Sequence, residues 1–414
     1  MSGSKKVSRR TIIAGAAAAA GGALLAKVPL VEAQQPSAPA NPSAAPGAGT
    51  TAQGARSAFE NPARTPTGVI TGSSLSPLQD LTGTITPSDL VFERHHSGIP
   101  AIDPARHRLM VHGLVDREMV FTMADLERLP SVSRIHFLEC SGNGRAAFRD
   151  PKPAMTPQQV DGLVSNGEWT GVLLATLLRQ VGVRAAGKWV FAEGADSAKL
   201  SRSVPIEKAM DDAIVAYAFN GEPLRPANGY PVRLLLPGYE GNMSVKWLRR
   251  LEVTDQPNMS RDETSKYTDP LADGTARQFT FVMDVKSIIT KPAAPARVMR
   301  GWNEIAGVAW SGRGRVARVD VSTDGGRSWT MAELQDPPPV RAFTRFRLMW
   351  EWDGRDTVIM SRATDETGAA QPTRAAFVSA RGAGTDYHFS SIRAWKVARD
   401  GAVTFDVPGG RDVD

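Results

Sequence analysis

Hydrophobic and polar positions follow one pattern from residue 75 to 278 and another from 279 to 414. In the first part, short apolar runs typical of strands alternate with stretches of helical period. The strand-like runs are 109–113, 135–139, 189–193 and 232–236, and the helical stretches are 169–181 and 206–211. Because these elements do not follow a strict strand–helix–strand order, the pattern predicts an α+β domain over 75–278.

In the second part the helical period disappears. Strand-like runs recur with turn residues between them, at 304–310, 315–322, 343–352, 357–363 and 392–397. One of them alternates polar Arg318 and Asp320 with apolar Val319 and Val321, as a half-buried strand requires. The pattern predicts an immunoglobulin-like β-sandwich over 279–414.

The N-terminal residues differ from both of these regions. Arg9 and Arg10 precede an apolar run rich in Ala and Gly, and residues 31–33 resemble a cleavage site. This order is typical of a twin-arginine signal peptide, which exports folded proteins to the periplasm, and we place it over 1–33. The alternative is an N-terminal anchor, but an apolar run of about 16 residues is short for a membrane span. Residues 34–74, rich in Pro and Ala, are predicted to be a linker or tail.

Composition narrows the classes of function. The 414 residues carry a formal net charge of +6, but residues 1–33 hold four of those charges, so the mature chain gives little support for a nucleic-acid partner. Cys140 is the one cysteine, which excludes an internal disulfide, a thiolate zinc cluster and a C-x-x-C-H haem attachment. No glycine-rich dinucleotide or P-loop motif is present either.

Cys140 follows an apolar strand and enters a Gly/Asn turn that ends at Arg145. The N–H groups of such a turn and the guanidinium are expected to lower the pKa of the thiol. From the residues alone two interpretations stay open: a buried free cysteine that packs as a small apolar group, or a thiolate that binds a metal. An unpaired reactive thiol is a liability in an exported protein, which adds weight to the second.

Six short motifs occur in an order that resembles the sulfite oxidase family of molybdenum enzymes. They are 92–96 (FERHH), 140–145 (CSGNGR), 193–197 (EGADS), 220–224 (NGEPL), 228–233 (NGYPVR) and the stretch 237–248 from PG to VKWL. Residues 307–311 and 324–326 resemble the family's C-terminal dimerisation domain. The resemblance runs from about residue 75 to the C-terminus. It implies a sulfite-oxidase-type molybdopterin domain followed by the immunoglobulin-like dimerisation domain.

The resemblance implies a molybdenum–molybdopterin cofactor. Cys140 matches the protein ligand of the metal, and a soft thiolate suits such a centre. Arg233, Lys246 and His96 are then expected to neutralise the cofactor phosphate, and Asp196 to accept hydrogen bonds from the pterin. The full set of implied cofactor contacts is Phe92, Glu93, Arg94, His95, His96, Cys140, Asp196, Asn228, Arg233, Ser244, Val245 and Lys246.

Arg94, Arg145 and Tyr267 match the family's catalytic anion pocket beside the metal. A guanidinium suits a sulfur oxyanion, and a tyrosine hydroxyl can donate to the oxygen that is transferred. In this family a basic residue of the dimerisation domain can also approach the site. Arg393 and Lys396 are the candidates here, and we leave both outside the predicted site.

The chain departs from the family pattern at Asn228, where many members have histidine, and at Met243 and Ser244, where they have Arg-His. Both changes remove potential cations, and the second makes the pocket less suited to a small dianion. Together with 263–270 (ETSKYTDP), they most resemble the molybdenum subunits of sulfane dehydrogenases in the periplasmic Sox sulfur-oxidising system.

That resemblance implies oxidation of sulfane sulfur held on a carrier protein. It also implies a separate cytochrome c subunit as electron acceptor, a homodimer or a heterotetramer with that subunit, and no membrane span. The alternative is a sulfite dehydrogenase that oxidises free sulfite. Less favoured are a methionine sulfoxide reductase, whose relatives lack the C-terminal sandwich, and a non-catalytic binding protein.

Overall fold

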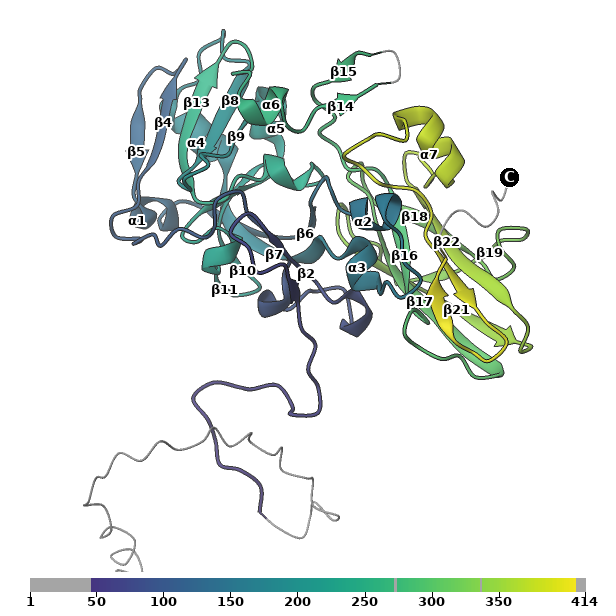
Figure 1. Cartoon of the computed structure of the whole chain (residues 1–414). Helices are drawn as coiled ribbons and strands as arrows, with labels where there is room; N and C mark the ends of the chain where they lie inside the picture. Colours follow the sequence, from purple (N-terminus) through teal and green to yellow (C-terminus); the bar gives the residue numbers. More distant parts are fainter. Residues whose placement is uncertain (1–45, 272–273, 336, 407–414) are drawn as a thin grey trace, which may run out of the picture. The chain divides into compact units, whose positions relative to one another are not determined.

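The computed structural model describes residues 46–271, 274–335 and 337–406. The chain divides into two units after Asn61, and every helix and strand of the described residues lies in the second (Figure 1). The predicted signal peptide over 1–33 lies outside the described residues. Within them, no helix is long and apolar enough to cross a membrane.

The second unit begins with a small antiparallel sheet. Its three strands are β1 (Thr65–Pro66), β2 (Ser73–Leu75) and β3 (Glu93–Arg94). Two 3-10 helices, η2 (Leu78–Asp80) and η3 (Ser88–Leu90), lie between β2 and β3. The last part of the predicted linker is therefore paired with the strand that carries Arg94.

Two five-stranded sheets form the first domain of this unit. One has the order β11-β10-β7-β6 with β12 also paired to β10, and the other has the order β5-β4-β13-β8-β9. The strands of the first are β6 (Ser131–Glu139), β7 (Val164–Leu173), β10 (Ile214–Phe219), β11 (Glu222–Pro223) and β12 (Arg233–Leu235). Those of the second are β4 (Leu109–Gly113), β5 (Met119–Phe121), β8 (Trp189–Gly194), β9 (Ser201–Pro205) and β13 (Leu248–Thr254).

Short helices connect these strands. They are α1 (Met123–Glu127), α2 (Arg145–Arg149), α3 (Pro157–Asp161), α4 (Leu174–Val181), α5 (Ile206–Asp211) and α6 (Arg261–Thr264), with 3-10 helices η4 (Pro226–Asn228) and η5 (Gly241–Met243). The buried face of α4, with Leu174, Leu177 and Leu178, packs into the same apolar cluster as the second sheet. The mixture of sheets and helices confirms the predicted α+β domain.

The helix expected over 169–181 is wrong in its first five residues, which belong to strand β7. β7 lies between β6 and β10, so both of its edges are hydrogen-bonded. At Gly171 a side chain has no room, because a Cβ would lie 2.2 Å from the Val215 carbonyl oxygen. Pairing on both edges therefore outweighs the local helical pattern.

The second domain is a sandwich of two antiparallel sheets (Figure 1). One has the order β16-β17-β21-β20 and the other β19-β18-β22-β23-β24. The strands are β16 (Lys286–Lys291), β17 (Gly301–Trp310), β18 (Val316–Ser322), β19 (Thr330–Met331), β20 (Glu333–Leu334), β21 (Thr344–Trp352), β22 (Thr357–Asp365), β23 (Ala394–Val397) and β24 (Val403–Phe405). A hairpin of β14 (Asp269–Pro270) and β15 (Ala276–Arg277) precedes it.

The predicted sandwich is confirmed, but the expectation that it lacks helices is wrong. Helix α7 (Arg374–Arg381) begins at Thr373, whose side chain accepts a hydrogen bond from the Ala376 N–H. Its one fully buried side chain, Phe377, packs on Phe148 of α2 and on Phe389. With a single buried residue, α7 shows no apolar stripe that a sequence pattern could reveal.

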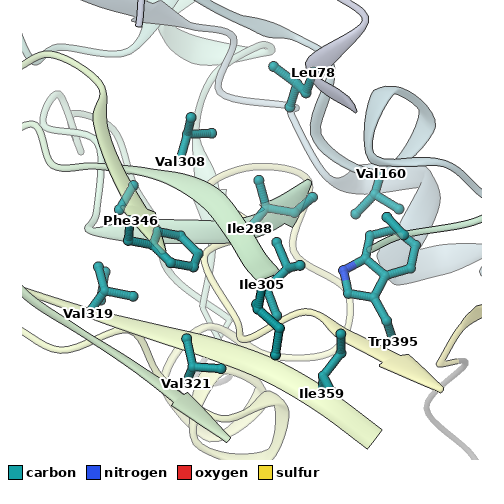
Figure 2. Close-up of a cluster of buried hydrophobic side chains, with 14 of the residues drawn as sticks. Leu78, Val160, Ile288, Ile305, Val308, Val319, Val321, Phe346, Ile359 and Trp395 are labelled. Atoms are coloured by element: carbon teal, nitrogen blue, oxygen red, sulfur yellow. The ribbon is translucent and has the colours of Figure 1, made fainter. Parts of the chain in front are cut away.

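One hydrophobic core extends across both domains. Ile288, Ile305 and Phe346 of one sheet face Val319, Val321 and Ile359 of the other (Figure 2). Leu78 and Val160 of the first domain belong to the same cluster. Each such fully buried side chain stabilises the fold by about 2 kcal/mol, so the two domains share apolar stabilisation.

We expect His136 to make the protein less stable in acid. The residue is 8% exposed, neither ring nitrogen has a hydrogen-bond partner among the described residues, and burial lowers its pKa to about 4. Between pH 6.5 and 4 the unfolded chain therefore binds a proton that the folded chain excludes, and stability falls as the pH falls. His136→Leu should remove about 2 kcal/mol of the loss between pH 8 and pH 5, measured by urea unfolding at both pH values. An equal loss of stability in both proteins would contradict this.

Candidate functional site

A cavity of about 670 Å³, including its open mouth, lies in the first domain. Its walls come from β3, the end of β6, the loop between β8 and β9, η4, β12, η5 and the segment after α6. It brings together Phe92, Arg94, His95, His96, Cys140, Asp196, Asn228, Arg233, Ser244, Lys246 and Tyr267 from the predicted set. The sequence did not predict the other lining residues, Leu138, Leu200, Ala227, Gly241, Asn242 and Trp247.

Cys140 lies where β6 gives way to a turn. Its N–H donates to the Leu163 carbonyl at 3.0 Å, and its carbonyl accepts from the Asn143 N–H at 2.9 Å. Gly144 follows in a left-handed conformation with φ of 88° and starts α2. On the other side, a Cβ on Gly241 would lie 2.6 Å from the Glu139 carbonyl oxygen, so η5 packs tightly on the peptide that precedes Cys140.

The expected lowering of the Cys140 pKa is not found. Burial raises the pKa of the thiol, and this outweighs the charges of Arg94 and Arg145, which act in the opposite direction. In the chain alone Cys140 is therefore a thiol. A bound metal cation would reverse this balance, because a coordinating thiol loses its proton.

Three cations of the cavity wall, Arg94, Arg233 and Lys246, have no acidic partner among the described residues, and the last two are the more buried. Arg233 is 3% exposed and donates at 2.8 Å to the carbonyl oxygens of Asn228 and Ser244. Lys246 donates at 3.0 Å to the carbonyl oxygens of Arg94 and Ala227. Within the described chain no carboxylate oxygen lies within 4.0 Å of either group. Burial lowers the pKa of Lys246 and lowers that of Arg233 to about 9, which is the cost of charges without a counterion.

His95 lies beside Lys246, and its ring nitrogens have distinct partners. Lys246 donates to Nδ1 at 2.8 Å, so the other nitrogen, Nε2, carries the hydrogen and donates to Glu93 at 3.1 Å. Burial lowers the pKa of His95, in agreement with a neutral ring, and the ring stacks on Trp247 with centroids 5.9 Å apart. Glu93 does not line the cavity but orients the histidine that does.

His96 lines the cavity, as predicted, and its ring is hydrogen-bonded to Tyr267. Its Nε2 lies 2.8 Å from the Tyr267 hydroxyl, and burial lowers its pKa to about 4. A neutral ring in this position does not supply positive charge to a phosphate. Burial raises the pKa of Tyr267 above its ordinary value, so the two groups form a neutral hydrogen-bonded pair.

Arg145, predicted in the anion pocket, does not line the cavity. Its Nε and Nη2 donate to the Asp386 carbonyl oxygen at 3.1 and 2.5 Å, and Nη2 lies 3.7 Å from the Asp386 carboxylate. Its guanidinium lies over the ring of Tyr387, whose hydroxyl accepts a hydrogen bond from the Tyr267 N–H at 3.2 Å. Arg145 thus anchors a loop of the second domain next to Tyr267.

The other predicted residues lie around this cavity as follows. Val245 is fully buried in the core of the first domain and does not reach the cavity. Arg393 pairs with Asp161 at 3.0 Å, and Lys396 is exposed on β23, so neither candidate from the second domain lines the site. From that domain it is Tyr387 that approaches the mouth.

The cavity fits an anionic, hydrogen-bonding cofactor. Arg233 and Lys246 leave positive charge uncompensated, and the buried Asn242 Oδ1 has no hydrogen-bond partner. The Asp196 carboxylate accepts from the Ser97 hydroxyl at 3.1 Å and from the Leu200 N–H at 3.3 Å, and it retains lone pairs for a further donor. Comparison with known protein families gives the same answer, because residues 96–261 match the oxidoreductase molybdopterin binding domain. Residues 277–393 match the Mo-co oxidoreductase dimerisation domain.

Individual relatives agree with both matches. The chain is 33% identical to sulfite oxidase of Gallus gallus over 314 residues, which cover 70% of this chain and 68% of that protein. It is similar to the solved sulfane dehydrogenase SoxCD from Paracoccus pantotrophus, with 43% identity, a TM-score of 0.85, and coverage of 88% of this chain and 96% of that one. The chain belongs to the sulfite oxidase family. Its cofactor is therefore molybdopterin with molybdenum.

Other members of the family are named for different enzymatic activities. Mitochondrial sulfite oxidase of Mus musculus is 32% identical over 319 residues, and the chain spans 58% of its length. An NADH nitrate reductase of Ulva prolifera is 32% identical over 278 residues, covering 60% of this chain and 32% of that protein. Family membership alone therefore does not identify the substrate.

We expect Lys246→Met to weaken cofactor binding selectively. Loss of one charge-assisted contact should reduce the stabilisation that the cofactor confers by about 2 kcal/mol. The measurement is the difference in melting temperature between protein made with and without the cofactor. Lys208→Met is the matched control, because Lys208 is 8% exposed and pairs with Asp212 at 2.6 Å away from the cavity. It should destabilise both forms equally, and a similar pattern for the two variants would disprove the assignment.

Proposed function

We propose that this protein is a periplasmic sulfane dehydrogenase that oxidises sulfane sulfur on a carrier protein and passes the electrons to a cytochrome c subunit. The observation that carries the proposal is the match to the SoxCD sulfane dehydrogenase, at 43% identity over 96% of that chain. The match to the named sulfite oxidases is lower, at 33% identity or less among the vertebrate relatives described above.

Met243 and Ser244 support this substrate over free sulfite, because they stand where many family members have two potential cations. Of the two arginines expected to bind a sulfur oxyanion, only Arg94 lines the cavity. Arg145 shares the Asp386 carboxylate with Arg149, which lies 2.8 Å from it. Fewer cations at the metal position suit a small dianion less well than a neutral or singly charged sulfur chain on a peptide.

The residues around the metal position have separate tasks. When bound, the molybdenum cofactor takes two electrons from the sulfur and provides the oxygen transferred to it. Arg233 and Lys246 would hold the cofactor phosphate, Asp196 would accept hydrogen bonds from the pterin, and Cys140 would be the protein ligand of molybdenum. Arg94, on the Cys140 side of the cavity, would orient a negatively charged sulfur group.

The hydrogen bond between Tyr267 and His96 can reverse its direction without forming a charged group. When the Tyr267 hydroxyl donates to His96 Nε2, its oxygen is free to accept a hydrogen bond from an incoming water. When His96 Nε2 carries the hydrogen and donates instead, the Tyr267 hydroxyl can donate to an oxygen in the cavity. Because burial keeps both groups neutral, this exchange requires only a change of tautomer and a rotation of the hydroxyl.

Assembly and location belong to the same proposal. The single cysteine leaves no place for covalently attached haem in this chain, so the electrons need a separate acceptor, which we take to be the cytochrome c subunit. The dimerisation domain supports a homodimer, with the cytochrome bound to each copy. Light scattering of the purified complex, with haem and molybdenum counted per chain, tests this assembly.

The location is tested separately. The double variant Arg9→Lys/Arg10→Lys should retain the protein in the cytoplasm if export uses the twin-arginine route.

The substrate is tested by steady-state kinetics of the holoenzyme with its cytochrome. We expect efficient turnover of sulfane sulfur bound to a carrier protein and little turnover of free sulfite. Efficient oxidation of free sulfite, without turnover of the carrier-bound substrate, would instead identify a sulfite dehydrogenase. A preparation from a molybdenum-competent host without molybdenum or pterin would indicate a binding protein.

We expect Tyr267→Phe to lower kcat by about 100-fold, because it removes the hydroxyl that donates to the transferred oxygen. Molybdenum content and melting temperature should stay close to those of the parent protein, since the ring and its contacts with Arg202 and Tyr387 remain. The control is Tyr239→Phe, a tyrosine that stacks on Phe281 outside the cavity and should retain full activity. A Tyr267→Phe enzyme with unchanged kcat would exclude a catalytic role for the hydroxyl.

A further inference from the structure

A buried group of charges joins the two domains directly behind Cys140. Glu139, the last residue of β6, is fully buried and accepts from Lys286 Nζ at 2.6 Å and from Trp310 Nε1 at 2.7 Å. Lys286 also lies 3.4 Å from the Asp161 carboxylate, which pairs with Arg393 at 3.0 Å. Lys286, Trp310 and Arg393 belong to the second domain, whereas both carboxylates belong to the first.

This group is balanced in charge. Two carboxylates face two cations, and all four side chains are nine-tenths buried or more. Buried ion pairs contribute little net stability compared with apolar packing, because desolvation offsets the attraction. Their geometry is nevertheless demanding, since any displacement leaves a charge unpaired in a medium of low dielectric constant. Such a group is therefore better suited to holding a fixed position than to stabilising the fold.

This group of charges fixes the position of Cys140. Glu139 also accepts from Asn143 Nδ2 at 3.0 Å, and the Asn143 N–H donates to the Cys140 carbonyl. The Glu139 carboxylate thus ties both sides of the Cys140 turn together, and Lys286 and Trp310 fix that carboxylate from the opposite domain. Leu163 makes two hydrogen bonds in this turn. Its N–H donates to Asn143 Oδ1, and its carbonyl oxygen accepts from the Cys140 N–H.

We propose that Lys286 and Trp310 of the sandwich are positioning residues for the sulfur of Cys140. The sandwich would then have a task in the metal site in addition to dimerisation. This inference rests on the assignment of Cys140 as the molybdenum ligand, proposed above. Groups behind a metal ligand orient it, and their removal commonly reduces metal affinity or activity by 10-fold to 100-fold, which is roughly the size of the effect expected here.

The chain offers a matched pair of substitutions for the test. Trp310 and Trp395 are both completely buried in the sandwich. Trp310 donates its indole N–H to Glu139, whereas Trp395 Nε1 has no hydrogen-bond partner in the part of the chain that the structure describes. Trp310→Phe and Trp395→Phe therefore remove similar volume from one core, and only the first removes a contact with Glu139.

Two measurements are made on each variant. The first is the electron paramagnetic resonance spectrum of molybdenum(V) in the holoenzyme, together with molybdenum retained after dialysis. The second is the rate at which iodoacetamide alkylates the cofactor-free protein, which reports Cys140 alone because it is the only cysteine. Neither measurement depends on the substrate, so failure of the proposed function would not affect the result.

We expect Trp310→Phe to shift the molybdenum(V) spectrum, to retain about 10-fold less molybdenum and to change the alkylation rate. Trp395→Phe should lower the melting temperature and leave these measurements unchanged. Identical behaviour of the two variants would overturn the proposal, since it would reduce Trp310 to a packing residue.

Should Trp310→Phe fail to fold, the double variant Glu139→Gln/Lys286→Met carries the same test, because it removes the ion pair without leaving a net buried charge. A folded double variant with the parent spectrum and alkylation rate would also overturn the proposal. Cys140→Ser provides the separate check on the ligand assignment, since it should abolish the thiolate signature and all alkylation.

Discussion

Positive charge without a protein counterion is the constraint around which the first domain is organised. Arg233 is held by carbonyl oxygens and Lys246 by carbonyl oxygens and the neutral ring of His95, and removing an ion from water costs several kcal/mol even after the surroundings relax. The fold tolerates this cost because the apolar clusters of both sheets are extensive. The cost is recovered when an anion occupies the cavity, so the same residues that strain the empty protein supply affinity for the cofactor. The electrostatics thus call for an anionic group, and the molybdopterin implied by the family match satisfies this requirement.

The charged groups on the other side of Cys140 are, in contrast, fully paired. Glu139 and Asp161 are fully matched by Lys286 and Arg393, so this region gains nothing from an added ion. Cys140 lies between the two regions, with unpaired cations on the cavity side and a neutral, rigid group on the other. With Cys140 as the proposed metal ligand, an anionic cofactor would be attracted from the cavity side only, and the ligand would be held in place from the other side. The apolar core that the two domains share keeps this charged group in register.

The sequence predicted those elements whose local pattern agrees with their tertiary surroundings. Strand 109–113 and helix 206–211 have the observed bounds, and the strand shows its alternating burial directly, whereas the helix buries Lys208 and Ala209. Residues 169–173 could not be assigned in this way, since pairing with β6 and β10 decides their conformation and neither partner is adjacent in sequence. The motifs brought most cavity residues into one cluster, as the structure does. They did not indicate that Arg145 would be hydrogen-bonded to Asp386, which is 241 residues away in the sequence. Asn242 was missed because its signal, an unpartnered amide oxygen, exists only in the folded chain.

The protonation of Cys140 follows from the same surroundings. Since burial raises the pKa of the thiol, the chain without metal presents a protonated sulfur of low reactivity. With Cys140 as the proposed metal ligand, a bound metal cation would take the place of the proton, so the thiolate and the bound cofactor would arise together. The side chain is partly exposed at the cavity, so it is the proton, and not complete burial, that keeps the sulfur unreactive in the chain alone. The charge-neutral group of Glu139, Asp161, Lys286 and Arg393 would hold the same position in both states.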